Sequence, residues 1–269
     1  MCELLGVSTV NPVHIRYSLE EFARHGGSSH INRSGWGVAY YEDNDVLRIR
    51  EASPAANSPW IEFLETNGLT SRCTIGHVRY ASVGGPGIVN THPFVRELGG
   101  RMHVFAHNGS IHDFETSLPF ETDMFRPVGQ TDSEHAFCVL LQRLAPLWAQ
   151  ADRAVPTLEA RMEIVTKTAA QFRTLGTANF LYSDGDVLFA HGHKRRFDVD
   201  GTFGEVRPPG LCMTRAVRFA EALNMSPTDM QSDGMLVASV PLSDEGWEPL
   251  GEGTVIAFRD GLEVACVDP

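Results

Sequence analysis

Strand-like segments lie at both ends of this chain, and two long helix-like segments lie between them. Runs rich in β-branched and aromatic residues come first, at 35–43 and 72–82. Apolar runs around Asp-Gly dipeptides, a strong hairpin signal, follow at 178–192 and 254–267. Strands grouped apart from helices favour an α+β fold over one in which the two alternate. We therefore expect two packed sheets with helices outside them.

The two central helices have start and stop signals. Residues 132–146 form an amphipathic pattern, which we expect Asp132 or Ser133 to cap and Pro146 to end. Residues 157–176 form a second such pattern that closes at a glycine.

Shorter elements complete the expected organisation. Helices at 18–26 and 58–68 each have a serine near the start and a glycine at the end. Residues 199–210 read as a loop within one domain that covers residues 2–269, because no repeat or linker interrupts the chain. Further strands are expected at 2–8, 46–52, 102–111 and 235–242.

Charge and cysteine usage exclude several classes of protein. The net charge of −12 would repel nucleic acid and anionic membranes, and the basic run at 193–197 is short enough to be a solvated loop. No run of 18 apolar residues or signal peptide is present, so we expect no membrane span. The five cysteines are odd in number, widely separated and without a Cys-x-x-Cys pair, which favours a reducing cytoplasm over disulfides or a zinc site.

Cys2 stands directly behind Met1 and ahead of an apolar run, "CELLGVS". One interpretation is structural, because free cysteine packs well at the start of a strand and most buried cysteines are inert. In the other, removal of Met1 leaves Cys2 with both a thiol and a free α-amine. The reference pKa of the amine, about 7.7–8.0, is close to that of the thiol, about 8.5, so one residue could supply base and nucleophile.

Polar residues at three other positions have two interpretations each. Arg79 is a rim charge or a bidentate partner for a carboxylate. Asn108-Gly109 is a tight turn or an oxyanion hole, in which the Asn amide and the Gly N–H both donate. Asp132 is a helix N-cap or a carboxylate that receives a ligand ammonium.

Five motifs in order carry a family resemblance: "MC", "GHVRYAS", "NTHPF", "AHNGSI" and "GQTDSE". Together they resemble the class II glutamine amidotransferases. The opening "MCELLGVS", the "GWG" at 35–37 and the "VASVPL" near the end are most similar to the small stand-alone branch known as the YafJ type. The resemblance extends from Cys2 to about Phe258. It implies an N-terminal-nucleophile (Ntn) hydrolase fold, a four-layer α-β-β-α sandwich of two mostly antiparallel sheets.

The resemblance also implies a reaction. A thiolate would attack the side-chain amide of glutamine, form a γ-glutamyl thioester and release ammonia, with no metal or other cofactor. The residues that match the family's motifs would then be the nucleophile Cys2, the oxyanion hole Asn108 and Gly109, and the substrate-binding residues Arg79 for the α-carboxylate, Ser82, and Asp132 for the α-ammonium.

Two further positions bear on the loop that, by the resemblance, closes over the glutamine substrate. The resemblance gives His92, in "NTHPF", a supporting role for that loop. Val83-Gly84 stands where relatives that feed sugar-phosphate synthases often have His-Gly. This departure leaves closure of the loop over the substrate an open question.

The acceptor of the ammonia is also open. A separate synthase could receive it, or the protein could act alone on another γ-glutamyl amide. A catalytically silent amino-acid-binding subunit is a further alternative. A metal hydrolase is disfavoured, because "HGHKR" at 191–195 holds two histidines and no third ligand is evident nearby.

Overall fold

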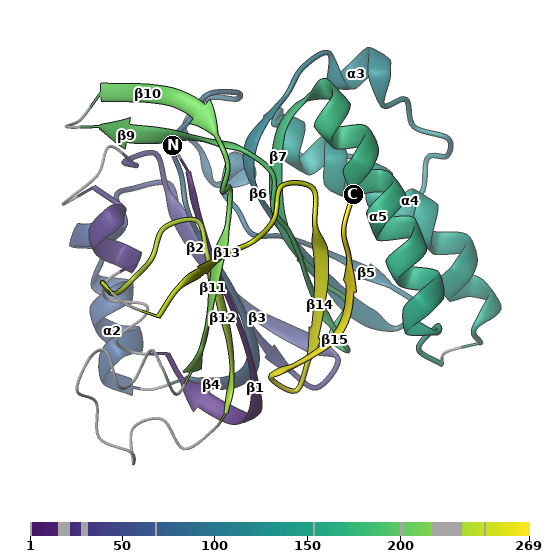
Figure 1. The fold of residues 1–269 in the computed structure, drawn as a ribbon, viewed down its shortest axis with the longest axis horizontal. Coiled ribbons are helices and arrows are strands. Elements are labelled where there is room, and N and C mark those ends of the chain that lie inside the picture. Colours follow the sequence, from purple (N-terminus) through teal and green to yellow (C-terminus); the bar gives the residue numbers. More distant parts are fainter. Residues whose placement is uncertain are drawn as a thin grey trace.

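Two antiparallel sheets pack face to face between two layers of helices (Figure 1). This architecture confirms the expected α-β-β-α sandwich. The structure is a computed structural model that describes residues 2–15, 22–27, 32–67, 69–152, 154–199, 202–216, 233–244 and 246–269. No helix in these ranges is both long and apolar enough to cross a membrane.

The first sheet has β1 near its centre, in the strand order β13-β11-β12-β1-β4-β2-β3. Helix α2 (Pro59–Asn67) lies on its outer side, together with the short 3₁₀ turn η1 (Ala55–Asn57). The strands are β1 (Glu3–His14), β2 (Trp36–Glu42), β3 (Asp45–Glu51), β4 (Thr70–Val78), β11 (Cys212–Arg215), β12 (Gly234–Ala238) and β13 (Glu248–Pro249).

The second sheet has the order β15-β14-β8-β7-β6-β5, and both predicted Asp-Gly hairpins, β7–β8 and β14–β15, are confirmed. Helices α4 (Asp132–Gln150) and α5 (Leu158–Leu175) cover its outer face. The remaining elements are η2 (Ile88–Asn90), α3 (Phe114–Ser117), β5 (Phe94–Leu98), β6 (Arg101–Ile111), β7 (Gly176–Ser183), β8 (Leu188–His191), β14 (Val255–Arg259) and β15 (Leu262–Val267).

The alternation of side chains along β1 sets the direction of the first residues. Leu4 belongs to the apolar cluster between the sheets, whereas Leu5 belongs to the cluster under α2. Because successive side chains of a strand point to opposite faces, Cys2 is directed to the same side as Leu4. The chain therefore starts at the interface between the two sheets.

Helix α4 differs from its prediction at both ends. Its N-cap is Thr131, whose hydroxyl accepts a hydrogen bond from the N–H of Glu134, and not Asp132 or Ser133. Pro146 lies inside the helix and does not end it. A proline removes one backbone hydrogen bond, but the buried face continues to Trp148, so packing maintains the last turn.

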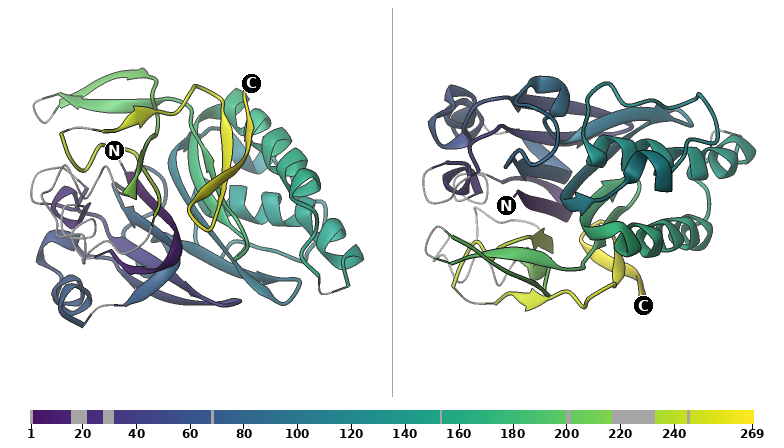
Figure 2. Two further views of the ribbon diagram at one scale, coloured as in Figure 1. Left: turned by 60° about the horizontal axis from the view of Figure 1, so that its bottom comes forward. Right: turned by 90° about the horizontal axis from the view of Figure 1, so that it is seen from above.

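The segment expected as a loop at 199–210 contains a strand. β9 (Arg195–Val199) pairs antiparallel with β10 (Thr202–Arg207), and this hairpin is separate from the two main sheets. It lies beside the N-terminal end of the chain (Figure 2). The sequence carries another Asp-Gly dipeptide at 200–201, which is the same signal that predicted the other two hairpins.

Other boundaries differ by a few residues. The strands expected to reach residues 82 and 242 end at Val78 and Ala238. β1 continues past the expected residue 8, through an irregular register with β4. Of the helix expected at 18–26, residues 22–25 are helical and residues 18–21 lie outside the described ranges.

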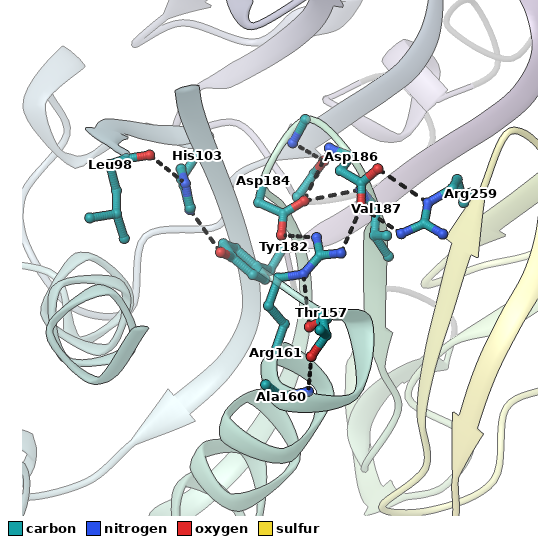
Figure 3. Close-up of polar contacts among 12 residues, drawn as sticks. Leu98, His103, Thr157, Ala160, Arg161, Tyr182, Asp184, Asp186, Val187 and Arg259 are labelled. Atoms are coloured by element: carbon teal, nitrogen blue, oxygen red, sulfur yellow. Dashed lines mark hydrogen bonds and ion pairs between the residues drawn. The ribbon is translucent and has the colours of Figure 1, made fainter. Parts of the chain in front are cut away.

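A buried ion cluster joins α5 to the turn between β7 and β8 (Figure 3). Arg161 donates to Asp184 and to Asp186, each at 2.6 Å, and Arg259 donates to Asp186 from β14. Asp184 also accepts hydrogen bonds from the backbone N–H groups of Asp186 and Val187. One guanidinium thus links the helix layer to the hairpin turn.

Candidate active site

The sulfur of Cys2 lies in a polar environment at the head of β1. It accepts a hydrogen bond from the Tyr80 N–H at 3.1 Å and donates to the Tyr80 carbonyl at 3.2 Å. Burial raises the pKa of the Cys2 thiol above its usual range, and the negative charge of Asp132 adds to this. The Tyr80 backbone and the positive charge of Arg79 act in the opposite direction and favour the thiolate.

Arg79 follows directly after β4 and is only 2% exposed, so it is not a rim charge. Its guanidinium donates to the backbone carbonyls of Val83 and Gly84 at 3.0 Å and of Gly85 at 3.2 Å. These contacts use three of its five N–H groups. Arg79 therefore holds the glycine-rich loop in place, and two N–H groups remain for a ligand.

Asp132 is a buried carboxylate at the start of α4. One of its oxygens accepts a hydrogen bond from the Ile111 N–H at 2.8 Å, at the end of β6. Because Thr131 is the N-cap, the carboxylate of Asp132 is not used in capping. The second oxygen of Asp132 faces the neighbouring hydroxyl of Ser133, at 3.4 Å.

Cys2, Arg79 and Asp132 come from three separate parts of the chain and lie within electrostatic range of one another. Each of the other two groups influences the pKa of Cys2. Burial lowers the pKa of the Arg79 guanidinium, and the charges of Cys2 and Asp132 act in the opposite direction. A thiol therefore lies within electrostatic range of one buried cation and one buried anion. That is a suitable environment for a zwitterionic ligand next to a nucleophile.

Asn108 and Gly109 lie inside β6, so they do not form the tight turn that the dipeptide also predicted. The side-chain amide of Asn108 donates to the hydroxyl of Ser239 at 3.1 Å, and its Oδ1 is buried without a hydrogen-bond partner in the described chain. A Cβ on Gly109 would come within 1.9 Å of the Thr177 carbonyl oxygen on β7. Glycine is therefore required at position 109 by packing alone, whatever its role in chemistry.

The two other predicted residues differ in their surroundings. Ser82 is exposed in the loop after β4, and no hydrogen bond within the described ranges joins it to the rest of the site. His92 is buried and stacks on His77, with ring centroids 4.1 Å apart. The structure thus brings together Cys2, Arg79 and Asp132 but leaves Ser82 at the edge of the site.

Three site neighbours were not identified from the sequence. His107 sits between the Ser133 hydroxyl at 2.9 Å and the Thr177 carbonyl at 3.3 Å. Because a carbonyl only accepts, its Nε2 carries the proton and its Nδ1 accepts from Ser133. Ser239 and Asn179 hold Asn108 at its side chain and its backbone carbonyl. All three contacts form across strands or between layers, so sequence spacing carries no signal for them.

The described residues contain no group of three or more His, Cys, Asp or Glu side chains that could hold a metal ion. Of the "HGHKR" histidines, His191 contacts the Thr254 carbonyl. His193 accepts a hydrogen bond from the Ala178 N–H. Both rings are thus held by the backbone of neighbouring strands.

Comparisons with known proteins agree over the whole chain. The family model described as class II glutamine amidotransferases matches residues 1–269. A Haemophilus influenzae protein with a provisional glutamine amidotransferase name is 31% identical over 281 residues, covering 98% of this chain and 86% of the relative. Escherichia coli YafJ, also provisionally named a glutamine amidotransferase, is 36% identical over 191 residues, covering 71% and 72%. The crystal structure of a predicted glutamine amidotransferase from Pseudomonas aeruginosa has 29% identity, a TM-score of 0.63 and coverage of 98% and 100%.

Proposed function

Because the chain belongs to the class II glutamine amidotransferases, we propose that it hydrolyses the side-chain amide of glutamine to glutamate and ammonia through a γ-glutamyl thioester on Cys2. The observation that carries the proposal is the Cys2 sulfur held by the Tyr80 backbone directly beside the buried Arg79, with the buried carboxylate of Asp132 within electrostatic range. A cysteine buried for packing alone would not need a buried cation and a buried anion beside it.

The first step forms a bond between the Cys2 sulfur and the side-chain carbonyl carbon of glutamine. Burial raises the pKa of this thiol, so a base must take its proton for attack near neutral pH. The α-amine of Cys2, free once Met1 is removed, serves as that base. The carbonyl oxygen becomes an oxyanion, which the Asn108 amide and the Gly109 N–H stabilise.

The second step breaks the carbon–nitrogen bond. The α-ammonium returns its proton to the leaving nitrogen, ammonia departs, and a thioester remains. Water then attacks the thioester carbon and gives one proton to the α-amine. The carbon–sulfur bond breaks, glutamate leaves, and the proton restores the thiol.

Specificity in this proposal comes from two charges. The remaining N–H groups of Arg79 bind the α-carboxylate of glutamine, and the second oxygen of Asp132, which lies 3.4 Å from the Ser133 hydroxyl, receives its α-ammonium. An amide without an amino-acid head would leave both buried charges without a ligand partner, which is costly. A separate synthase that accepts the ammonia is the partner we propose. All five cysteines are unpaired, which supports a reducing cytoplasm as the compartment.

The test measures ammonia release from glutamine by the wild-type protein and by Cys2→Ala. We expect the variant to lose activity with almost no change in melting temperature, and intact mass to show that active wild-type protein lacks Met1. Cys266→Ala, at the exposed cysteine of β15, should keep full activity.

A glutamine-mimicking electrophile should modify Cys2, as located by peptide mapping. Active protein that retains Met1 would contradict the amine-base mechanism. Faster release of amines from other γ-glutamyl compounds than of ammonia from glutamine would assign the alternative substrate. Glutamine binding without turnover would indicate the silent binding subunit.

A further inference from the structure

The nucleophile and the proposed oxyanion hole belong to different sheets. Cys2 heads β1 in the first sheet, whereas Asn108 and Gly109 lie in β6 of the second. The distance between attacking sulfur and oxyanion donors therefore depends on contacts across the interface between the sheets. A displacement of about 1 Å at such a site can cost 100-fold in rate, so these contacts bear on catalysis.

Ser239 supplies a polar contact across that interface at the active end. It follows β12, is buried, and exchanges backbone and side-chain hydrogen bonds with Leu4, two residues after Cys2. The Ser239 N–H donates to the Leu4 carbonyl at 3.0 Å, and the Leu4 N–H donates to the Ser239 hydroxyl at 3.1 Å. The same hydroxyl accepts from the Asn108 side-chain amide at 3.1 Å.

The Asn108 carboxamide makes one hydrogen bond with the described residues. Its Oδ1 lacks a hydrogen-bond partner among the described residues, so the hydrogen bond from Nδ2 to Ser239 is the polar contact that holds the carboxamide in place. A carboxamide displaced from this position would no longer hold the second N–H of Nδ2 in place for an oxyanion. An oxyanion needs the donor.

The Asn108 backbone is held separately. Asn179, its cross-strand neighbour on β7, donates to the Asn108 carbonyl at 2.9 Å. Loss of the Ser239 hydroxyl would therefore free the Asn108 side chain while its main chain stays in place.

We propose that Ser239 is a positioning residue that fixes the Asn108 carboxamide of one sheet against the nucleophile-bearing strand of the other. This inference rests on the proposed function, because it gives Asn108 the donor role in amide hydrolysis. Ser239 itself touches neither substrate nor nucleophile in this scheme and acts through Asn108.

The test is a double-mutant cycle on glutamine hydrolysis with Ser239→Ala, Asn108→Ala and the double variant. Removing one oxyanion donor costs about 100- to 1,000-fold in kcat, so we expect Ser239→Ala to lower kcat by about 10- to 100-fold with KM within about threefold. In the Asn108→Ala background, Ser239→Ala should lower kcat by less than about threefold. Ser239→Thr keeps the hydroxyl and should restore most of kcat.

Two controls separate positioning from folding. Ser71 is a buried serine at the far end of β4. Its hydroxyl accepts a hydrogen bond from a backbone N–H and donates one to a backbone carbonyl. Ser71→Ala should leave kcat unchanged. Alkylation of Cys2 by iodoacetamide displaces iodide at a saturated carbon and forms no oxyanion. Its rate should therefore be the same in Ser239→Ala as in wild type.

The possible outcomes are distinct. Additive losses in the cycle, or equal losses of kcat and of Cys2 alkylation rate in Ser239→Ala, would overturn the inference while the proposed function stands. The same holds if Ser239→Ala has normal kcat. A wild type that releases no ammonia from glutamine would overturn the proposed function, and this inference with it.

Discussion

At the scale of single residues, Arg79 combines two tasks that are usually separate. Its guanidinium holds the carbonyls of residues 83–85 and thereby shapes the loop at the rim of the site. Its charge also favours the thiolate of Cys2. The planar arrangement of five N–H groups allows Arg79 to bind the loop carbonyls and, in the proposed function, a ligand carboxylate as well.

Arg79→Lys should therefore separate charge from geometry. Lysine keeps the positive charge but has three donors from one point, so loop carbonyls and ligand compete for them. Hydrogen bonds to charged groups contribute about 1.5–3 kcal/mol each, so we expect KM for glutamine to rise at least about tenfold. The alkylation rate of Cys2 at fixed pH should change much less. Steady-state kinetics and alkylation measure the two effects.

A matched control is Arg173→Lys on α5, where the guanidinium donates to the Gly253 carbonyl away from the site residues. Its KM should equal that of the wild type. An unchanged KM in Arg79→Lys would remove Arg79 from the binding site, and an equal rise in both variants would point to a general loss of packing.

The sequence placed Asp132 at the start of a helix but did not distinguish a cap from a ligand-binding carboxylate. Thr131, Asp132 and Ser133 are all good N-caps, so local preference alone cannot choose among them. The choice depends on β6, because Asp132 accepts from the Ile111 N–H. Ser239 was beyond prediction for a similar reason, since strand pairing brings it to Leu4 across 235 positions.

At the scale of elements, the sequence correctly predicted those helices and hairpins that short-range signals determine. The hairpins at 184–185 and 260–261 were found because an Asp-Gly turn needs only its flanking strands. β5 was missed because it is a five-residue edge strand, with pairing on one side only. The continuation of α4 past Pro146 depends on burial against the second sheet, which no local rule contains.

The link between α5 and the β7–β8 turn gives a prediction for stability. Arg161 and Asp184 are almost completely buried, so Arg161→Leu would leave a buried carboxylate without its cation. Loss of one partner of a buried ion pair costs about 3–5 kcal/mol. We expect the urea midpoint of Arg161→Leu to fall accordingly, as followed by circular dichroism.

Lys167→Ala on the same helix is the control for this prediction. Lys167 pairs with Glu163 on the exposed face of α5, where the ion pair is screened by solvent. The urea midpoint should hardly change. Equal shifts in both variants would mean that helix propensity, and not the buried pair, determines the stability of α5.

At the scale of the whole molecule, the interior holds imidazoles that stay neutral. His77 and His92 are buried, and none of their four ring nitrogens has a hydrogen-bond partner among the described residues. Burial lowers the pKa of His77 to about 3 and that of His92 well below its usual range. Burial also lowers the pKa of His103 to about 4 and that of His191 to about 3.

These four groups predict acid sensitivity of the fold. An unfolded histidine titrates near pH 6.5, so between that pH and about 4 the unfolded chain binds more protons than the folded one. The free energy of unfolding is therefore highest above pH 6.5 and falls as the pH drops through this window. Each histidine should cost about 1.4 kcal/mol per pH unit well below 6.5. Urea unfolding at pH 7.5, 6.5 and 5.5 measures the slope.

The slope, rather than absolute stability, identifies the groups responsible. His77→Gln removes one titrating ring. The slope of the free energy of unfolding below pH 6.5 should therefore fall by the contribution of one proton, about 1.4 kcal/mol per pH unit, even if the variant is less stable at every pH. A wild-type stability that stays flat between pH 7.5 and 5.5 would mean that these rings are protonated in the folded protein. The folded protein would then hold charged imidazoles in its interior. That would contradict the burial of His77 and His92 and their lack of hydrogen-bond partners among the described residues.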